Sequence, residues 1–489
     1  MIQPPEINWF ALLPMIALGL GAAVVLLVDV QLKPHPRWLV RLGVAILVAT
    51  AGGSLLQGWW LRRLEAGEVT GTVTPFGALL IMDRFAIFGT LLLVAIAILS
   101  LGAGQRFLVS LGRRAAEAIA LLLLSTAGFA LLLSTTQLVM MFLGLEIGSI
   151  SLYVVAGLSR QERQSEEAAI KYFLLGSFAS AIFIYGVALV FAGTGSLQLF
   201  EQQQLLRQVI FFKPGVLLVG LALLIVGLAF KVTAAPFHGW APDVYQGAPA
   251  GMVGFMAAAA KVGGFAALVR IMATAFEGYI EVWGTVVAAI AILSMIVGSF
   301  LAVVQTDFRR LLAYSGVAHA GFILTGIVAG EAGVGSIWFY LAVYAVQLVG
   351  AYAIVAAVSG PASAGSPISA YSGLAKRQPM LANGLTVLLL GMAGIPLTSG
   401  FIAKFGVFQD AFRAGFGWLV VVAVLASVVS FFIYLRVVVA MYMQDPAVSE
   451  SLTVTVPVRL VVWTALGMTL VLGLLPVPLL RLTALALPL

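Results

Sequence analysis

The stretch GLAFKVTAAPFHGWAPDVYQGAPA, residues 227–250, decides how this chain folds, because it places polar groups and a helix breaker inside an apolar region. Apolar residues 216–227 precede the break, and a second apolar run, 251–260, leads to Lys261. A proline in a helix interior removes a backbone donor and clashes with the preceding turn. We therefore expect an apolar helix that carries Lys231 and breaks near Pro236.

The composition is that of a membrane protein. Of the 489 residues, 62% are hydrophobic and only 9% are charged, and the mean hydropathy is +1.11. Soluble domains carry about 25% charged residues. Apolar runs of about 20 residues recur along the chain, and such a run is long enough to cross a bilayer as a helix. The runs lack the alternation of barrel strands, so we predict an all-α polytopic membrane protein.

We expect about fourteen transmembrane helices, at roughly 9–30, 39–59, 85–104, 115–134, 137–158, 167–192, 215–238, 245–273, 281–304, 311–329, 335–358, 382–412, 417–442 and 459–481. Since no long linker separates them, we assign 1–489 to a single membrane domain. Its predicted parts are three N-terminal spans in 1–104, a first inverted repeat in 115–273, a second inverted repeat in 281–442 and a last span at 459–481.

Basic residues are distributed unequally between the two sides that this span order defines. One side carries Lys33, Arg37, Arg41, Arg106, Arg113, Arg114, Arg160, Arg163, Arg309, Arg310, Lys376, Arg377, Arg436 and Arg459. The other side carries Arg62, Arg63, Arg84, Arg207, Lys213, Arg270, Arg413 and Arg481. Because cytoplasmic loops are enriched in Lys and Arg, we expect both termini on the periplasmic side. The net charge of +7 follows from this bias and does not indicate a nucleic-acid partner.

The chain offers few groups for redox chemistry. The absence of cysteine excludes disulfides, thiolate metal sites and iron–sulfur ligation. Three histidines and few acids argue against a redox metal, and no phosphate-binding loop of the G-x-x-x-x-G-K-[ST] type is present. We therefore expect no cofactor and no metal in this chain. The start, MIQPPEINWF, lacks a basic segment and a cleavage site, so we expect the first span to be retained.

Five charged residues are not easily placed in loops or at span ends: Glu146, Lys171, Lys231, Lys261 and Lys404. A charge at the bilayer centre costs about 2.5–3.5 kcal/mol on insertion scales, and such residues usually mark ion or proton pathways. A buried lysine can exchange its proton near neutral pH, whereas arginine stays protonated. Structural alternatives exist: an ion pair for Glu146, a buried neutral lysine for Lys261, and for Lys171 a side chain that reaches the interface.

A second break is predicted in LGMAGIPLTSGFIAKFGVF, residues 390–408. Gly394, Pro396 and Gly400 interrupt this apolar run, and Lys404 follows the proline by eight residues. The two interrupted helices are the seventh and the twelfth, and an offset of five spans inverts their direction. This pattern indicates an inverted-topology repeat, in which broken helices mark the ion site; chance placement of prolines is the alternative.

The three histidines differ in context. His35 lies in a basic loop and is expected at the surface. His238 either links Lys231 to Lys261 or lies at the cytoplasmic surface. His319, in LLAYSGVAHAGFIL, can donate and accept protons near neutral pH, and packing between helices is an equal alternative.

Several stretches together resemble the antiporter-like membrane subunits of respiratory complex I, the proton-translocating NADH-quinone oxidoreductase. They are FKVTAAPFHGWAPDVYQGAPA, GLEIGSISLYVVAGL, EEAAIKYFLLGSFASAIFIYG, DFRRLLAYSGVAHAGF and GMAGIPLTSGFIAKFGVF. Of the related subunits L, M and N, subunit N is the most similar, because PFHGWAPDVYQGAP resembles its motif and because Lys404 stands where subunit M has a glutamate.

The resemblance implies roles for the buried charges in proton translocation. Glu146 corresponds to the fifth-helix glutamate that is coupled to the broken-helix lysine, Lys231. Lys171 corresponds to a sixth-helix lysine near that pair. Lys261 corresponds to the central lysine of the eighth helix, and Lys404 to the lysine of the second broken helix.

The resemblance also implies that His238 bridges the broken helix to the central lysine. It further implies a subunit that couples electron transfer to quinone with proton pumping, while NADH, FMN and iron–sulfur clusters are held by other subunits. The expected partners are the antiporter-like subunit M, small membrane subunits and, indirectly, the peripheral arm. The expected location is a bacterial inner membrane, with a thylakoid membrane as the alternative. A cation/proton antiporter subunit without redox activity, and a purely structural span of the membrane arm, are the rival functions.

Overall fold

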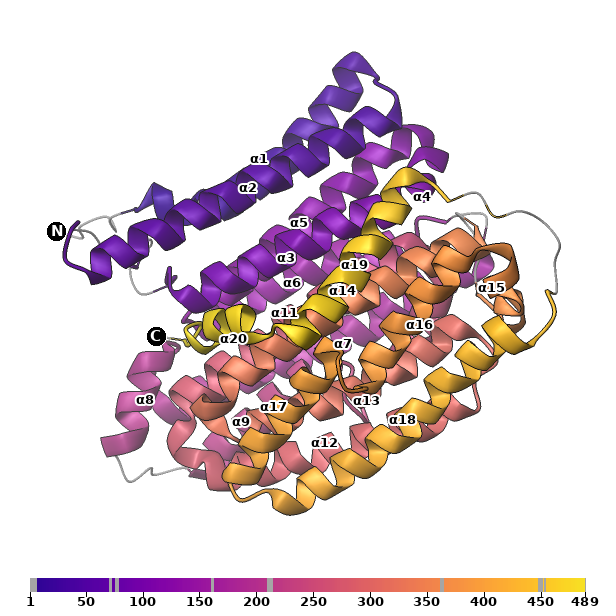
Figure 1. The fold of residues 1–489 in the computed structure, drawn as a ribbon. Coiled ribbons are helices and arrows are strands. Elements are labelled where there is room, and N and C mark those ends of the chain that lie inside the picture. Colours follow the sequence, from indigo (N-terminus) through magenta and orange to yellow (C-terminus); the bar gives the residue numbers. More distant parts are fainter. Residues whose placement is uncertain are drawn as a thin grey trace.

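The computed structural model describes residues 7–69, 73–74, 79–159, 162–208, 214–360, 365–446, 452 and 454–488. Arg160 and Lys213, which entered the charge comparison, lie outside the described residues. Within the described part, the chain is a bundle of helices without strands, and the long helices run roughly alongside one another (Figure 1). The expected all-α polytopic class is confirmed.

Each of the fourteen expected spans corresponds to a helix or a broken helix of the described chain. The N-terminal group is α1 (Trp9–Leu32), α2 (Pro36–Glu65) and α3 (Arg84–Ala103). The next group is α5 (Ala115–Ser134), α6 (Leu138–Ala156), α7 (Arg163–Thr194), the broken helix α9 (Pro214–Lys231) and α10 (Trp240–Gly247), and α11 (Ala250–Arg270). The third is α12 (Ile280–Val303), α13 (Phe308–Ile327), α14 (Val334–Ser359), the broken helix α16 (Pro379–Ala393) and α17 (Ser399–Arg413), and α18 (Gly417–Met443), followed by α19 (Val456–Leu474).

Four short helices lie outside these spans: α4 (Gln105–Ser110), α8 (Leu199–Gln208), α15 (Leu374–Arg377) and α20 (Val477–Ala484). The last span was expected to reach 481, but α19 ends at Leu474. Pro476 and Pro478 cannot donate backbone hydrogen bonds to a continuing helix, so the chain turns and α20 begins.

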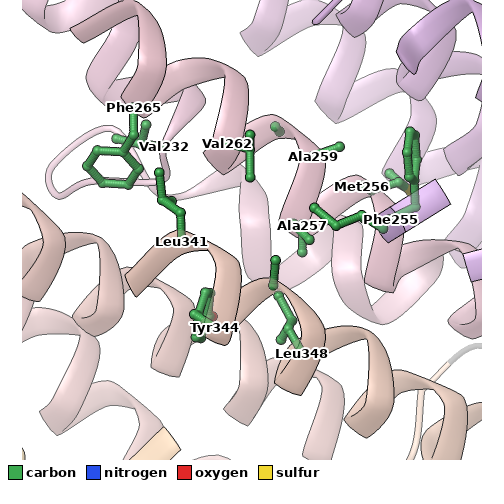
Figure 2. Packing of buried hydrophobic residues seen from close by; sticks show 14 of the residues in the cluster. Val232, Phe255, Met256, Ala257, Ala259, Val262, Phe265, Leu341, Tyr344 and Leu348 are labelled. Carbon is green, nitrogen blue, oxygen red and sulfur yellow. The ribbon is translucent and has the colours of Figure 1, made fainter. Parts of the chain in front are cut away.

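Two helices form the centre of the bundle. Every residue of α11 is buried, and most of α14 is buried as well. Figure 2 shows Ala257 of α11 next to Leu348 of α14. A helix that is apolar on all sides, as these are, is suited to a core position. The lysine of α11, Lys261, is therefore enclosed by protein on every side.

The second and third groups of helices pack in matching ways. The first two helices of each group, α5 with α6 and α12 with α13, approach so closely that only glycine fits at the contact. A Cβ on Gly128 would lie 2.3 Å from the Gly148 nitrogen, and a Cβ on Gly298 would lie 2.4 Å from the Ala318 nitrogen. Small residues at such contacts are typical of membrane helices.

Candidate functional site

The first helix break follows Lys231 directly. The chain leaves the helix through Thr233, whose φ is +63°. Breaking a helix leaves backbone groups without intrahelical partners, and neighbouring side chains replace them. Ser294 of α12 accepts a hydrogen bond from the Ala235 nitrogen at 2.9 Å, and the Trp240 indole donates to the Phe230 carbonyl at 3.2 Å. Side chains of the surrounding fold therefore stabilise the break.

Lys261 of α11 binds the carboxyl end of this broken helix. Its Nζ donates to the Val232 carbonyl at 2.8 Å and to the Thr233 hydroxyl. The side chain is 1% exposed. The carboxyl end of a helix carries partial negative charge and favours a cation. Breaking α9 thus creates the polar site that holds Lys261.

Lys231, the last residue of α9, lies in an aromatic environment. Its Nζ is 3.5 Å from the Tyr153 hydroxyl and 5.2 and 5.7 Å from the ring centroids of Tyr153 and Tyr172. Its Cβ packs against Gly264, one turn beyond Lys261 on α11. The two lysines are therefore neighbours that hold different partners.

Glu146 is half-buried on α6 and accepts a hydrogen bond from the Ser180 hydroxyl of α7. The described residues contain no ion pair between Glu146 and Lys231. Tyr153, seven residues further along α6 and thus on the same face, makes the contact with Lys231 instead. Glu146 and Tyr153 therefore share a face of α6, and of these two residues only Tyr153 contacts Lys231 in the described structure.

The second break separates α16 from α17. Two residues there have positive φ angles, Gly394 at +85° and Leu397 at +72°. The side chain of Lys404, on α17, folds back and donates to the Ala393 carbonyl at 2.9 Å, the last residue of α16. It also donates to the Ser427 hydroxyl of α18 at 3.2 Å. Lys404 is 5% exposed, so a buried lysine again binds the carboxyl end of a broken helix.

His319 of α13 lies between the two breaks. Its ring nitrogens hydrogen-bond to the hydroxyls of Tyr340, at 2.8 Å, and Tyr434, at 3.1 Å. Its ring stacks on Tyr344 with 4.3 Å between centroids. On one side, Tyr344 and Lys261 both border Gly316. His319 is thus connected through Tyr344 to the first break.

On its other side, His319 reaches the second break through Phe322. The two rings contact each other edge to face at 5.8 Å, and the Lys404 Nζ lies 4.4 Å from the Phe322 ring centroid. A buried series of polar and aromatic groups therefore runs from Lys231 and Lys261 through His319 to Lys404.

Lys171 lies apart from this series. Helix α7 begins at Arg163, and its 32 residues are longer than the bilayer core requires, so the end with Lys171 reaches the polar side. Lys171 pairs with Glu167 at 2.5 Å and with Asp243 of α10 at 2.7 Å, while Arg310 binds the other Asp243 oxygen at 2.6 Å. This placement agrees with the interface alternative, and no hydrogen bond or ion pair of the described residues joins Lys171 to Glu146 or Lys231.

His238 is half-buried just past Pro236. Its ring lies 6.2 Å from that of Tyr314, and its Nδ1 has no hydrogen-bond partner in the described structure. Within the same residues, no hydrogen bond joins it to Lys231 or Lys261. His35 accepts a hydrogen bond from the Arg37 nitrogen at 3.2 Å, at the exposed start of α2, in agreement with a surface position.

Several groups that the structure places in the site could not be selected from the sequence. Thr233, Ser427 and Tyr434 are ordinary polar residues of membrane helices, and only their contacts with Lys261, Lys404 and His319 distinguish them. The described residues contain no group of three or more His, Cys, Asp or Glu side chains that could hold a metal ion.

A further buried ion pair was also not foreseen. Arg270, at the end of α11, binds Asp83 through Nη1 at 3.0 Å, with 1% and 0% of the two side chains exposed. Its Nη2 donates to Asp83 and to the Leu133 carbonyl at 2.8 Å. The sequence placed Arg270 at a span end, which is correct, but the position is enclosed by α3 and α5 rather than exposed.

Comparisons with known proteins identify the family. Residues 135–430 match the family model described as NADH:quinone oxidoreductase/Mrp antiporter, transmembrane. NADH-quinone oxidoreductase subunit N of Trichlorobacter lovleyi is 36% identical over 96% of this chain and 95% of its own length. Subunit N 1 of Solibacter usitatus is 42% identical over 82% of this chain and 83% of its own length.

Solved structures agree. A chain of respiratory complex I from Thermus thermophilus, with bound aureothin, has a TM-score of 0.80 and 32% identity over 97% of this chain and 100% of its own length. A chain of the Mrp complex from Dietzia sp. has a TM-score of 0.82 over 97% of both chains but only 20% identity, which shows a shared fold. The chain therefore belongs to the subunit N family of NADH-quinone oxidoreductase, as the resemblance predicted.

Proposed function

We propose that this chain is the proton-translocating subunit of the membrane arm of an NADH-quinone oxidoreductase. One observation carries the proposal: three lysines, each at most 5% exposed, lie at two helix breaks that His319 and its aromatic neighbours connect. Buried ionisable groups in membrane spans usually mark ion or proton pathways. In this proposal, other subunits of the complex carry out the electron transfer to quinone.

In this mechanism the charges act in sequence. Glu146 biases the proton occupancy of Lys231 from the face of α6 that also carries Tyr153, the residue in contact with Lys231. Lys231 in turn biases Lys261, its neighbour across the first break, because like charges in a medium of low dielectric constant disfavour each other. The proton then passes by way of His319 to Lys404, from which it leaves toward the periplasm. Lys171 and His238 would serve the cytoplasmic side of the same route.

The proposal includes the surroundings of the chain. NADH, FMN and iron–sulfur clusters would be held by other subunits of the complex. The neighbours would be the antiporter-like subunit M and small membrane subunits, with the peripheral arm acting indirectly. The host membrane would be a bacterial inner membrane, with both termini on the periplasmic side.

The test is purification of the tagged chain in mild detergent, with identification of its partners and an assay of NADH:quinone reductase on the same sample. A large assembly with reductase activity, which pumps protons in proteoliposomes and loses pumping in Lys261→Met, is the expected result. Lys376→Met is the matched control, because Lys376 is exposed and paired with Asp445. A chain that purifies alone, or with antiporter-type partners and sodium-dependent proton exchange, would contradict the proposal.

A further inference from the structure

A large apolar groove runs between the N-terminal helices and the C-terminal helices, away from the buried lysines. It has a volume of about 750 Å³. Helices α2 and α3 form one wall, and α14, α19 and α20 form the other. Its lining includes Trp59, Arg62, Arg84, Ala95, Leu99 and Leu482. No residue of the proposed proton route lines it.

The two ends of the groove differ in polarity. Arg62, Arg84 and Trp59 lie where α2 ends and α3 begins. Tryptophan is enriched at the headgroup level of a bilayer, so this end marks the interface. From Arg84 to Leu99, α3 extends about 22 Å at 1.5 Å per residue, which matches the roughly 20–22 Å of one leaflet when its headgroup region is included. The groove thus has the polarity and the length of a lipid in one leaflet.

Helix α20 covers the same end of the groove. Its Leu479 and Leu482, and Leu485 just beyond it, line the groove, whereas Arg481 between them does not. This pattern of leucines on one face is that of an amphipathic helix lying at the membrane interface.

Positive charge gathers at the interfacial end. Three of the eight basic residues on the less basic side, Arg62, Arg63 and Arg84, are found here. Arg63 pairs with Glu68 and Arg84 with Glu65, while the described part of the chain contains no ion pair of Arg62. One positive charge in this group is therefore left without a counter-ion from the described chain, next to an apolar groove.

We propose that the groove binds a phospholipid with an anionic headgroup. Its phosphate would lie at Arg62 and Arg84, and its acyl chains would lie along α3, against α14 and α20. Acyl chains are thinner than a helix, which is about 10–12 Å across with its side chains, and they conform to an irregular groove. The lipid would join the N-terminal helices to the C-terminal helices.

The experiment uses the intact complex reconstituted into vesicles that contain a photo-crosslinkable phosphatidylglycerol or, in a parallel sample, phosphatidylethanolamine with the same photoreactive chain. Crosslinked peptides are then mapped by mass spectrometry. We expect phosphatidylglycerol to label peptides that contain residues 54–62 and 87–99. Arg62→Gln should lower the labelling about fivefold, the effect expected for one arginine near an anionic headgroup.

Two further variants keep the result interpretable. Ala95→Trp places a large ring in the groove from an exposed position and should block labelling without disturbing the core. Arg113 is exposed on the more basic side of the protein, so Arg113→Gln should leave the labelling unchanged. Equal labelling by both lipids, labelling that survives Ala95→Trp, or protein crosslinks that place a neighbouring subunit's helix in the groove would overturn the proposal.

Discussion

At each of the two helix breaks a buried lysine binds the carboxyl end of a helix, but the lysine comes from a different part of the fold in each case. At the first break, Lys261 comes from the following helix, α11, and binds the end of α9, while Lys231 of α9 itself remains free to contact Tyr153. At the second break, Lys404 comes from the other half of the same broken helix. The first break therefore uses two lysines where the second uses one.

The last helix of each repeat shows where the difference arises. Helix α11 carries Lys261 and, nine residues later, Arg270; helix α18 carries Ser427 and, nine residues later, Arg436. Arg270 donates to the Leu133 carbonyl near the end of α5, and Arg436 donates to the Val303 carbonyl at the end of α12, at 2.5 Å. The arginine contacts are thus equivalent, and the lysine of α11 is replaced by a serine in α18.

The largest expected effect concerns these two arginines. Arg270→Met leaves Asp83 as a buried charge without its partner, which should lower the free energy of unfolding by about 3–5 kcal/mol. Among the residues that the structure describes, Arg436 binds carbonyl groups only, so Arg436→Met should cost about 1.5–3 kcal/mol. Unfolding titrations of the two variants in mixed detergent micelles make the comparison. Equal losses would show that the Asp83 pair adds nothing at the first repeat.

Lys404→Met should remove two roles at once, because this lysine binds the end of α16 and, in the proposed route, also carries the proton. We expect proton pumping in proteoliposomes to fall at least tenfold, and the free energy of unfolding to fall by about 1.5–3 kcal/mol, the contribution of a hydrogen bond from a charged group. Lys376→Met serves as the control. Normal pumping in Lys404→Met would remove this residue from the route.

At the first break the two roles should separate. Lys231→Met and Lys261→Met should each reduce pumping at least tenfold. Only Lys261→Met should destabilise the protein by about 1.5–3 kcal/mol, because it leaves the end of α9 without its donor. In the described part of the chain, Lys231 makes no hydrogen bond shorter than 3.5 Å. If Lys231→Met proved as destabilising as Lys261→Met, the division of roles would be wrong.

The smallest effect is expected where α10 meets its neighbours. Asp243 binds Lys171 and Arg310, but these side chains are partly exposed, and such pairs contribute about 0.2–1 kcal/mol. Asp243→Asn should therefore cost less than about 1 kcal/mol at low salt, and less still at 1 M salt, where charges are screened. Glu167→Gln, which affects the Lys171 pair alone, is the matched control. A loss that does not change with salt would indicate a packing role for Asp243.

Local sequence was sufficient for the span count, the two breaks and the buried charges. Apolar runs, interior prolines and charges in apolar surroundings are properties of short windows, and the bilayer acts on each window in the same way. The exact end of the last span was less predictable, since Pro476 follows an apolar run that continues beyond it.

The sequence by itself therefore determined that this chain is a polytopic helical protein in which Lys231, Lys261 and Lys404 are buried at two broken helices. Only the tertiary structure decided what each lysine contacts. Lys261 meets Val232, 29 residues away, and Arg270 meets Asp83, 187 residues away. These pairs depend on which helices pack together. The physical reason is that packing follows from the shapes of whole helices and not from the hydropathy of any one segment, as the glycine contact of α5 with α6 illustrates.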